Sequence, residues 1–272
     1  MENSSSLDKL PRKKLALITG ASSGIGLEYA FLVAEQYEED IALVARREDR
    51  LEHLKREIQK RNPNKTVLVL PYDLSCTENI SKLWNEIAAT GYDVTLLINN
   101  AGFGDFGFFK DLDIENALKM VDLNIKAILD LSAKVVPRMV ELNYGNIINV
   151  SSMASFQGLP FLATYAASKS FVTSFSLALG QELERYNINV QALCPGPVST
   201  EFGDVAGFKG KVNLTSSLSA RQVASKSLDA LKVKKSVVIP GYMNYLLAQA
   251  NRFLPRAFAT KLAYYVIRSK AE

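Results

Sequence analysis

The sequence predicts a doubly wound α/β fold, with one seven-stranded parallel sheet covered by helices on both faces. Short apolar runs alternate with helical patterns along the chain, which is typical of strands buried on both faces. A glycine-rich segment also joins the first apolar run to the first helical pattern, as expected for a tight strand-to-helix turn. The 272 residues are 48% hydrophobic and 22% charged, so the chain can bury a large core.

Seven apolar runs are the expected strands. They are Leu15–Thr19, Ile41–Ala45, Val67–Leu70, Val94–Ile98, Asn146–Val150, Ile188–Leu193 and Val237–Ile239. Helices are expected between the strands. One of them should begin near Ser219, because Ser219 and Gln222 have the spacing of a capping box.

The chain shows no linker or repeat, which predicts a single domain over residues 1–272. We expect the polar residues 1–9 to be disordered and residues 242–272 to form a helical extension. The N-terminus has no apolar core of the kind found in signal peptides. The long uncharged stretch from 142 to 168 is broken by Asn, Ser, Gly and Pro, so no membrane span is expected.

The composition argues against several classes of function. The net charge is +4, and basic and acidic residues are interleaved, so we expect no nucleic-acid partner. Cys76 and Cys194 lie far apart, which predicts reduced thiols in a cytoplasmic protein. The only histidine, His53, lies among charged residues of an expected helix, and we therefore expect no metal site.

The segment from Thr19 to Gly26 reads TGASSGIG, a variant of the glycine fingerprint of dinucleotide-binding turns. A strand, a glycine turn and a helix in this order direct backbone N–H groups at a pyrophosphate. The candidate cofactor-binding residues of this loop are Gly20, Ser22, Ser23, Gly24, Ile25 and Gly26. The alternative is an ordinary flexible loop, which the position directly after the first strand disfavours.

Tyr165 and Lys169 are four residues apart, so they lie one turn apart on the same face of a helix. A free phenol has a pKa of about 10 and is a poor acid or base at neutral pH. A nearby ammonium favours the phenolate and moves the pKa of the phenol towards neutrality. Ser152 lies upstream of this pair, and Ser151 is its immediate competitor.

Together these segments resemble the short-chain dehydrogenase/reductase family in its one-domain branch, which has a Rossmann fold. The resemblance extends from about residue 15 to about residue 240 and includes the NNAG sequence at 99–102 and the PGPVST sequence at 195–200. The features are most similar to those of 3-oxoacyl reductases and hydroxysteroid dehydrogenase-like members. This resemblance implies an oxidoreductase that transfers hydride reversibly between a nicotinamide and a carbonyl or secondary alcohol.

The resemblance also implies the roles of the site residues. Tyr165 would be the proton donor, Ser152 would bind the carbonyl oxygen, and Lys169 would lower the pKa of the phenol and bind ribose. Asn124 would complete a proton relay to Lys169, although it also fits an interior helical amide. Contacts with the cofactor are implied for Asp73, Leu74, Asn99, Asn100, Ala101, Gly102, Tyr165, Lys169, Pro195, Gly196, Val198 and Thr200.

We expect the cofactor to be NADP(H). Ala45 stands where the NAD-preferring members have an aspartate, and Arg46 follows it. A guanidinium binds a 2′-phosphate with paired hydrogen bonds, whereas a carboxylate repels it. Ser23 stands where NADP-preferring members often have a second basic residue, and Arg46 and Arg47 also fit a solvent-exposed pair.

Three segments are expected to surround an apolar substrate pocket: residues 103–109, 155–162 and 201–215, the last as a mobile lid. They favour a hydrophobic ketone, such as an acyl chain, a steroid or a xenobiotic carbonyl. Their aromatic residues equally fit the core or a subunit interface. The tail from 242 onwards is basic and aromatic. It fits packing on the domain or over the substrate cleft, or contact with a membrane surface.

Family habit implies a homodimer or homotetramer through the helices around 113–142 and 162–186. Two other functions fit parts of this pattern. A catalytically silent dinucleotide sensor typically lacks the tyrosine or the lysine, and both are present here. A sugar-nucleotide epimerase or dehydratase needs a different glycine spacing and a larger C-terminal domain.

Overall fold

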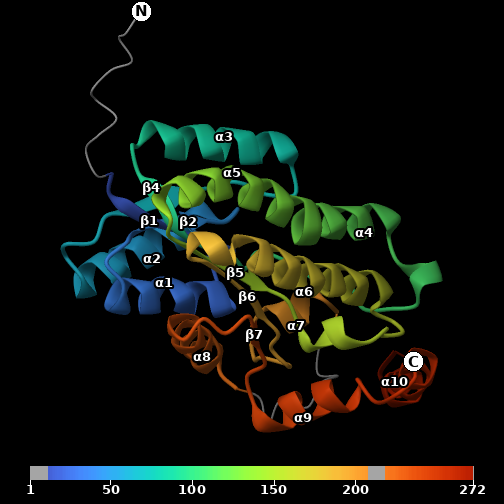
Figure 1. Cartoon of the computed structure of the whole chain (residues 1–272). Coiled ribbons are helices and arrows are strands. Elements are labelled where there is room, and N and C mark those ends of the chain that lie inside the picture. Colours follow the sequence, from blue (N-terminus) through green and yellow to red (C-terminus); the bar gives the residue numbers. More distant parts are fainter. Residues whose placement is uncertain (1–11, 208–217, 272) are drawn as a thin grey trace, which may run out of the picture.

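The computed structural model describes residues 12–207 and 218–271. Seven parallel strands form one sheet in the order β3-β2-β1-β4-β5-β6-β7 (Figure 1). The strands are β1 (Lys14–Thr19), β2 (Asp40–Val44), β3 (Val67–Leu70), β4 (Asp93–Asn99), β5 (Gly145–Val150), β6 (Ile188–Leu193) and β7 (Val237–Val238). The prediction of a doubly wound seven-stranded sheet is confirmed, and each expected strand end lies within one residue of the observed end.

Helices cover both faces of the sheet because neighbouring residues of a strand point to opposite sides. In β1, Ala16 and Ile18 join one core cluster, whereas Leu15 and Leu17 join the other. The first cluster includes residues of α1 (Gly24–Gln36), α2 (Glu48–Arg61) and α8 (Ala220–Lys232). The second includes residues of α3 (Thr77–Ala89), α5 (Ala127–Leu142) and α6 (Ala163–Leu183).

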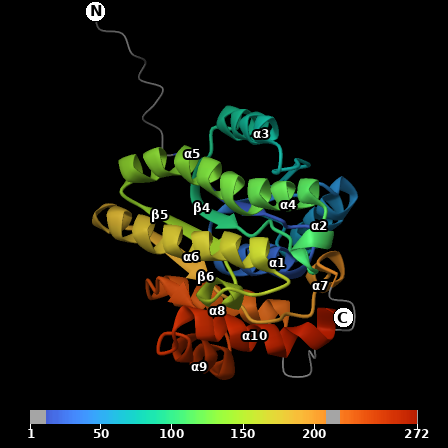
Figure 2. The ribbon, with the colours of Figure 1, turned by 90° about the vertical axis from the view of Figure 1, so that its right-hand side faces the viewer.

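The remaining elements lie mostly near the carboxyl ends of the strands or beyond α8, on the side away from the sheet (Figures 1 and 2). They are η2 (Phe109–Asp111), α4 (Ile114–Val121), the π-helix η3 (Asp122–Lys126), η4 (Met153–Phe156), η5 (Glu184–Tyr186), α7 (Phe202–Val205), α9 (Tyr242–Ala250) and α10 (Arg256–Ala271). The expected capping box at the start of α8 is confirmed, with Ser219 and Gln222 bonding reciprocally. No helix among the described residues combines the length and apolarity needed to cross a bilayer.

The strand order reverses between β1 and β4, which places a crevice at their carboxyl ends. The Thr19 hydroxyl joins the two strands there. It donates to Ile98 O at 3.2 Å and accepts from the N–H groups of Asn100 and Ala101 at 2.9 and 3.0 Å. The residues after β1 and β4 are therefore held against each other at the point where doubly wound folds bind ligands.

Two expectations lie outside the described residues. These are the disorder of residues 1–9 and most of the expected lid, because the structure describes only residues 201–207 of that segment.

Candidate active site

The glycine loop after β1 is packed too tightly for side chains at two of its glycines. Gly20 has φ +65°, and a Cβ there would lie 2.7 Å from Asn100 Nδ2. A Cβ at Gly26 would collide with the Gly20 carbonyl oxygen. These contacts fix the path of the turn, so the backbone enters α1 directly below the crevice.

The N-terminus of α1 has the properties of an anion site. Its N-cap residue Ser23 makes no side-chain capping bond, and its first turn contains no acidic residue. The leading N–H groups of a helix need partners and carry partial positive charge, so they suit a phosphate. The chemistry of this loop therefore fits the pyrophosphate of a dinucleotide.

Arg47 makes the closest contacts of the two adjacent arginines with the glycine loop. Its guanidinium donates to the hydroxyls of Ser22 and Ser23, each at 3.1 Å. Arg46 instead points into solvent, and its Nη1 lies 3.9 Å from Asp73 Oδ2. The loop that has no basic residue of its own thus receives a cation from the start of α2, a contact that the sequence alone did not predict.

Glu201 binds the same guanidinium from the opposite side of the site. It accepts from Arg47 at 2.9 Å and from Arg50 at 2.5 Å. These two hydrogen bonds, led by that of Arg50, lower the pKa of the exposed Glu201 carboxyl to about 2. The segment after β6 is therefore joined to the start of α2 by ion pairs.

Asp73 and Leu74 form the turn after β3. Asp73 Oδ1 accepts from the Ser75 N–H at 3.0 Å and from its hydroxyl at 2.7 Å, while Leu74 is buried in the second core cluster. The turn places the Asp73 carboxylate beside Arg46 at the carboxyl edge of the sheet.

Tyr165, Lys169 and Ser152 come together at the carboxyl end of β5. Tyr165 and Lys169 are buried on α6, and the Lys169 ammonium lies 5.8 Å from the centre of the Tyr165 ring. The Ser152 side chain lies beside the Tyr165 phenol, and its Oγ accepts from the Ala154 N–H at 3.1 Å. Lys169 Nζ donates to Val150 O at 2.8 Å, so α6 is bound to the end of β5 at this point.

Ser151 points away from this group. Its buried hydroxyl donates to Lys169 O at 2.8 Å and lies 2.7 Å from Thr173 Oγ1. It therefore holds α6 against β5, and of the two adjacent serines it is Ser152 that faces the phenol.

Burial determines the acid–base properties of the pair. It raises the pKa of the Tyr165 phenol to about 12, although the interaction with the nearby Ser152 side chain offsets part of this increase. Burial also lowers the pKa of the Lys169 ammonium to about 8. The sequence predicted a lowered pKa for the phenol, but in the structure this pKa is raised. The cost of burying a phenolate outweighs the attraction of the ammonium.

Asn124 lies in the π-helix η3, a local distortion that often occurs at functional sites. Its fully buried amide donates to Phe103 O at 3.0 Å and to Ser168 Oγ at 3.1 Å. A Cβ added at Gly102 would lie 2.9 Å from Asn124 Oδ1 and 3.3 Å from Lys169 Nζ. The loop after β4, η3 and α6 therefore meet at this glycine.

The segment after β6 closes the other side of the site. Met153 N donates to Pro195 O at 2.9 Å, and Val198 packs against the first core cluster. A Cβ at Gly24 would lie 3.2 Å from Thr200 Cγ2. A Cβ at Gly196 would lie 2.6 Å from Asn244 Nδ2, so α9 supports this segment.

Aromatic and aliphatic side chains surround the phenol. Phe103, Phe106, Leu159 and Phe202 pack against the buried cluster that contains Tyr165. The Tyr165 and Phe202 rings are 5.5 Å apart. The three segments expected to surround a pocket thus contribute side chains to this apolar wall, as far as the structure describes them.

Phe161 connects this wall to α10. Its ring lies 5.0 Å from that of Phe108 and 5.5 Å from that of Tyr264, centre to centre. Its backbone has φ +68°, a strained conformation for a side chain of this size. Since Tyr264 belongs to α10, the C-terminal helix packs on the domain beside the candidate site.

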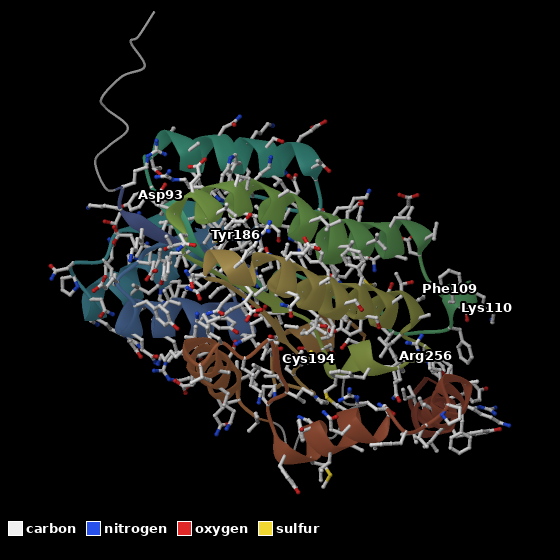
Figure 3. All side chains as sticks on the ribbon, viewed as in Figure 1. Asp93, Phe109, Lys110, Tyr186, Cys194 and Arg256 are labelled. Atoms are coloured by element: carbon white, nitrogen blue, oxygen red, sulfur yellow. The ribbon has the colours of Figure 1, made fainter. Side chains whose placement is uncertain are left out.

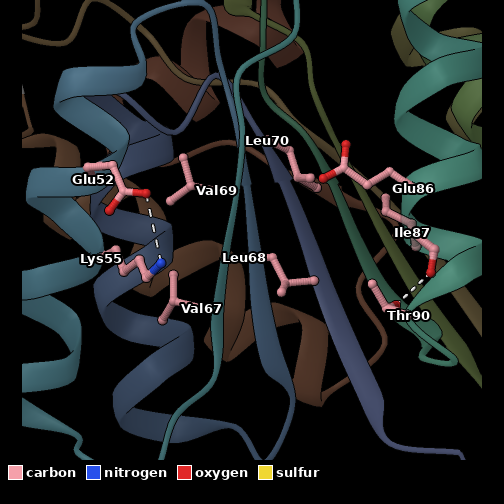
Figure 4. A pocket seen from close by; sticks show the side chains of 9 residues that line it. All are labelled: Glu52, Lys55, Val67, Leu68, Val69, Leu70, Glu86, Ile87 and Thr90. Atoms are coloured by element: carbon pink, nitrogen blue, oxygen red, sulfur yellow. Dashed lines mark hydrogen bonds and ion pairs between the residues drawn. The ribbon is translucent and has the colours of Figure 1, made fainter.

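A surface hollow elsewhere on the molecule carries none of the candidate residues. It runs along the edge strand β3 between α2 and α3 (Figure 4). Its lining consists of Glu52, Lys55, Val67, Leu68, Val69, Leu70, Glu86, Ile87 and Thr90. Within the described part of the chain, no three His, Cys, Asp or Glu side chains gather in a way that would hold a metal ion.

The family model described as short chain dehydrogenase matches residues 14–207, which include every strand from β1 to β6. The chain belongs to this family. It is an oxidoreductase that acts on alcohol and carbonyl groups, as the resemblance in the sequence implied.

Relatives of known name agree with this assignment. An NADP-dependent 3-hydroxy acid dehydrogenase of Schizosaccharomyces pombe is 32% identical over 83% of this chain and 90% of its own length. A short-chain dehydrogenase from Sphingobium yanoikuyae, solved in complex with NADPH, is 30% identical, with a TM-score of 0.78 over 85% of this chain and 88% of its own. A bulky-bulky ketone specific alcohol dehydrogenase from Comamonas testosteroni is 28% identical, with a TM-score of 0.75 over 89% of this chain and 94% of its own.

Proposed function

We propose that this short-chain dehydrogenase is an NADP(H)-dependent enzyme that interconverts a bulky apolar ketone and its alcohol. The observation that carries the proposal is the buried Tyr165 side chain, which lies beside Ser152 and Lys169 and is enclosed by an apolar wall. A proton donor in such a place suits a carbonyl group on an apolar substrate.

The residues of the crevice fit the dinucleotide. The N–H groups of the glycine loop and α1 would bind the pyrophosphate, and the turn at Asp73 and Leu74 would contact the adenine. The loop at Asn100, Ala101 and Gly102, together with Pro195, Gly196, Val198 and Thr200, would line the nicotinamide half. When bound, the nicotinamide supplies the hydride for reduction and accepts it in the reverse direction.

The preference for NADP(H) is supported by the cations near the glycine loop. Arg47 lies against Ser22 and Ser23, and Arg46 lies nearby at the end of β2. Two guanidiniums at this place would bind a 2′-phosphate with charge-assisted hydrogen bonds. Arg47 thus joins Arg46 as a proposed ligand of the phosphate. The relatives whose names include NADP or NADPH agree with this preference.

Tyr165 is proposed to protonate the carbonyl oxygen during reduction. With a pKa of about 12, the phenol is protonated at neutral pH, which is the form that reduction requires. Ser152 would donate a hydrogen bond to the same oxygen and stabilise the charge that develops on it. Because the Ser152 side chain lies beside the phenol, both hydroxyls can reach one carbonyl oxygen.

Lys169 is proposed to stabilise the phenolate that forms after the proton leaves. Its ammonium is held beside the phenol by the hydrogen bond to Val150 O. Its other N–H groups would bind ribose hydroxyls. Asn124 lies near Lys169 at Gly102. It would complete a proton relay that passes through Lys169 and returns a proton to the phenol.

The substrate is proposed to be a bulky hydrophobic ketone, such as a 3-oxoacyl, steroid-like or xenobiotic carbonyl compound. The phenyl rings of Phe103, Phe106 and Phe202 offer an apolar surface beside the phenol. The bulky ketone named for the Comamonas relative fits this range.

A spectrophotometric screen tests this function. Acyl, steroid, quinone and small aromatic carbonyl compounds are offered with NADPH and, separately, with NADH. We expect turnover with at least one bulky ketone and a higher kcat/KM with NADPH than with NADH. Tight NADPH binding without turnover of any carbonyl class would contradict the proposal and favour a dinucleotide sensor.

We also propose that the chain works as one catalytic domain in a cytoplasmic homo-oligomer. Exposed apolar residues on α4, α5 and α6 support the oligomer: Ile114, Leu118, Leu129 and Leu177. The thiols Cys76 and Cys194 are both free, as expected in a reducing compartment. Light scattering of the purified protein should give a dimer or tetramer, and a Leu118→Glu variant should give the monomer.

A further inference from the structure

The helix α10 is apolar on two opposite sides. One side packs on the domain through Ala259 and Ala263, which are buried, and through Tyr264, which stacks on Phe161. The opposite side exposes Phe258 and Leu262, which follow each other at helical spacing. A helix on the surface of a soluble protein normally turns its polar side to water, so this outward side needs another partner.

The same feature continues onto α9 and the turn between the two helices. Both helices lie along one side of the molecule (Figures 1 and 2). Their exposed large apolar residues are Tyr242, Met243, Tyr245, Leu246, Leu247, Phe253, Phe258, Leu262, Tyr265 and Val266, which we call the α9–α10 face. Single exposed apolar residues are normal in proteins, but this many neighbours on adjacent elements mark an interaction surface.

The charged residues of α9, α10 and the turn between them have one sign. Arg252, Arg256 and Lys261 are exposed, and Arg268 lies over the Tyr264 ring. Residues 242–271 contain no aspartate or glutamate. Figure 3 shows Arg256 towards the same end of the molecule as Lys110 and the exposed Phe109. Aromatic residues flanked by cations are the composition of helices that lie in the interface of a membrane.

We propose that the α9–α10 face docks on an anionic lipid bilayer, with its aromatic residues in the headgroup region and its cations on lipid phosphates. A second copy of this chain is a poorer occupant. In a twofold dimer this face would meet itself, and its cations would repel one another. An anionic membrane instead offers opposite charge and an apolar interior together.

Docking in this way would place α10 between the bilayer and the Phe161 region. The inner side of α10 contacts Phe161 through Tyr264, and Thr260 lies against Gly158. The inference needs no particular chemistry at the active site, so it stands independently of the proposed function.

Vesicle sedimentation tests the inference. The full chain is mixed with phosphatidylcholine vesicles or with vesicles that also contain phosphatidylserine as the anionic lipid. We expect binding to the anionic vesicles, weaker binding to the neutral ones, and loss of binding as salt is raised. Arg256→Gln and Lys261→Gln should each weaken binding about fivefold, since a basic residue near the surface contributes about 1 kcal/mol.

Two substitutions on the face are compared with one elsewhere. Leu262→Glu and Phe253→Glu should each weaken vesicle binding by at least about tenfold, because they add a negative charge and remove apolar contact. Phe253 is 86% exposed, so its replacement leaves the fold intact. Val233→Glu adds the same charge at an apolar residue that is 75% exposed beyond α8, and it should change binding less than about twofold.

Three results would overturn the inference. The first is failure of the wild-type protein to bind anionic vesicles at low salt. The second is equal vesicle binding by wild type and both face variants. The third is a wild-type oligomer that Leu262→Glu and Phe253→Glu dissociate, since this would assign the face to a second copy of the chain.

Discussion

Lys169 carries a charge that the fold buries at a cost. Its side chain is 3% exposed, and burial lowers the pKa of its ammonium to about 8. Below pH 8 the ammonium is charged in both the folded and the unfolded chain, so the full cost of burying it opposes folding. Between about pH 8 and the ordinary lysine pKa of about 10.4, the folded protein loses this proton first, so its stability rises with pH.

This linkage predicts how Lys169→Met behaves in the cofactor-free protein. The variant lacks the buried charge, so its free energy of unfolding relative to wild type should be higher at pH 7 than at pH 9.5. The difference should fall by about 2 kcal/mol between these two pH values. About 1.5 pH units of the range lie above the pKa of the buried lysine, and each contributes about 1.4 kcal/mol. Urea unfolding at the two pH values measures it, and a difference that stays constant would contradict the burial of a charged lysine.

Arg47 and Glu201 predict how the protein distinguishes NADPH from NADH. Arg47 bonds Ser22, Ser23 and Glu201, whereas Arg46 lies mainly in solvent. Arg47→Ala should weaken NADPH binding by at least about tenfold, the effect of losing a hydrogen bond to a charged group. NADH has no 2′-phosphate, so its affinity should change less than about threefold.

Glu201→Gln is the matched control for Arg47→Ala. It removes the carboxylate that occupies Arg47 and Arg50, so NADPH should bind more tightly while NADH binds as before. Fluorescence titration of each variant with both cofactors gives the four affinities. Equal losses of NADPH and NADH affinity in Arg47→Ala would show that Arg47 supports the loop rather than the phosphate.

At the level of residues, the sequence could predict which residues form the site and roughly where they lie. It could not predict the directions in which their side chains point. Arg46 and Arg47 are neighbours of one kind, and only the start of α2 determines which guanidinium turns to the glycine loop. Similarly, the spacing of Tyr165 and Lys169 predicts their shared face, but it says nothing of how deeply they are buried. Burial sets the direction in which both pKa values move.

At the level of elements, α10 contributes to the active-site region through one aromatic contact. Tyr264 stacks on Phe161, whose positive φ is held by packing from Phe106, Phe108 and Tyr264. A strained backbone persists only where its surroundings hold it. The loop before α6 therefore depends on a helix about 100 residues further along the chain.

Removing this contact should alter substrate selection. In Tyr264→Ala, the Phe161 loop loses its support, so the KM for a bulky ketone should rise several-fold with a smaller change for a small ketone. Tyr242→Ala removes a tyrosine that is 77% exposed on α9 and should leave both KM values unchanged. A loss of kcat alone, equal for the two ketones, would argue against a role of α10 in the pocket.

The helices and strands also differ in how well the sequence pattern predicts them. The strands were predicted to within one residue because strands buried on both faces are continuous apolar runs between polar residues. The π-helix at Asp122–Lys126 had no such signal, because its apolar pattern is that of an ordinary helix. The Phe161–Tyr264 contact was also beyond reach, since it depends on packing between distant segments.

At the level of the whole molecule, the fold gathers residues from distant segments at one edge of the sheet. Strand order reverses between β1 and β4, and the glycine loop, the loop after β4 and the segment after β6 meet at that place. This convergence was predictable, because parallel strands end on the same side. The identity of the ketone was not, since it depends on the shapes of loops whose sequences follow no period.

The central claim is that Tyr165 delivers the proton to a carbonyl group beside the bound dinucleotide. The most direct measurement is the kcat/KM of Tyr165→Phe, together with its affinity for NADPH. The account predicts a loss of kcat/KM by a factor of about 10² to 10⁴, the usual contribution of a general acid, with unchanged cofactor affinity. A variant that keeps wild-type kcat/KM with its best ketone would contradict the claim.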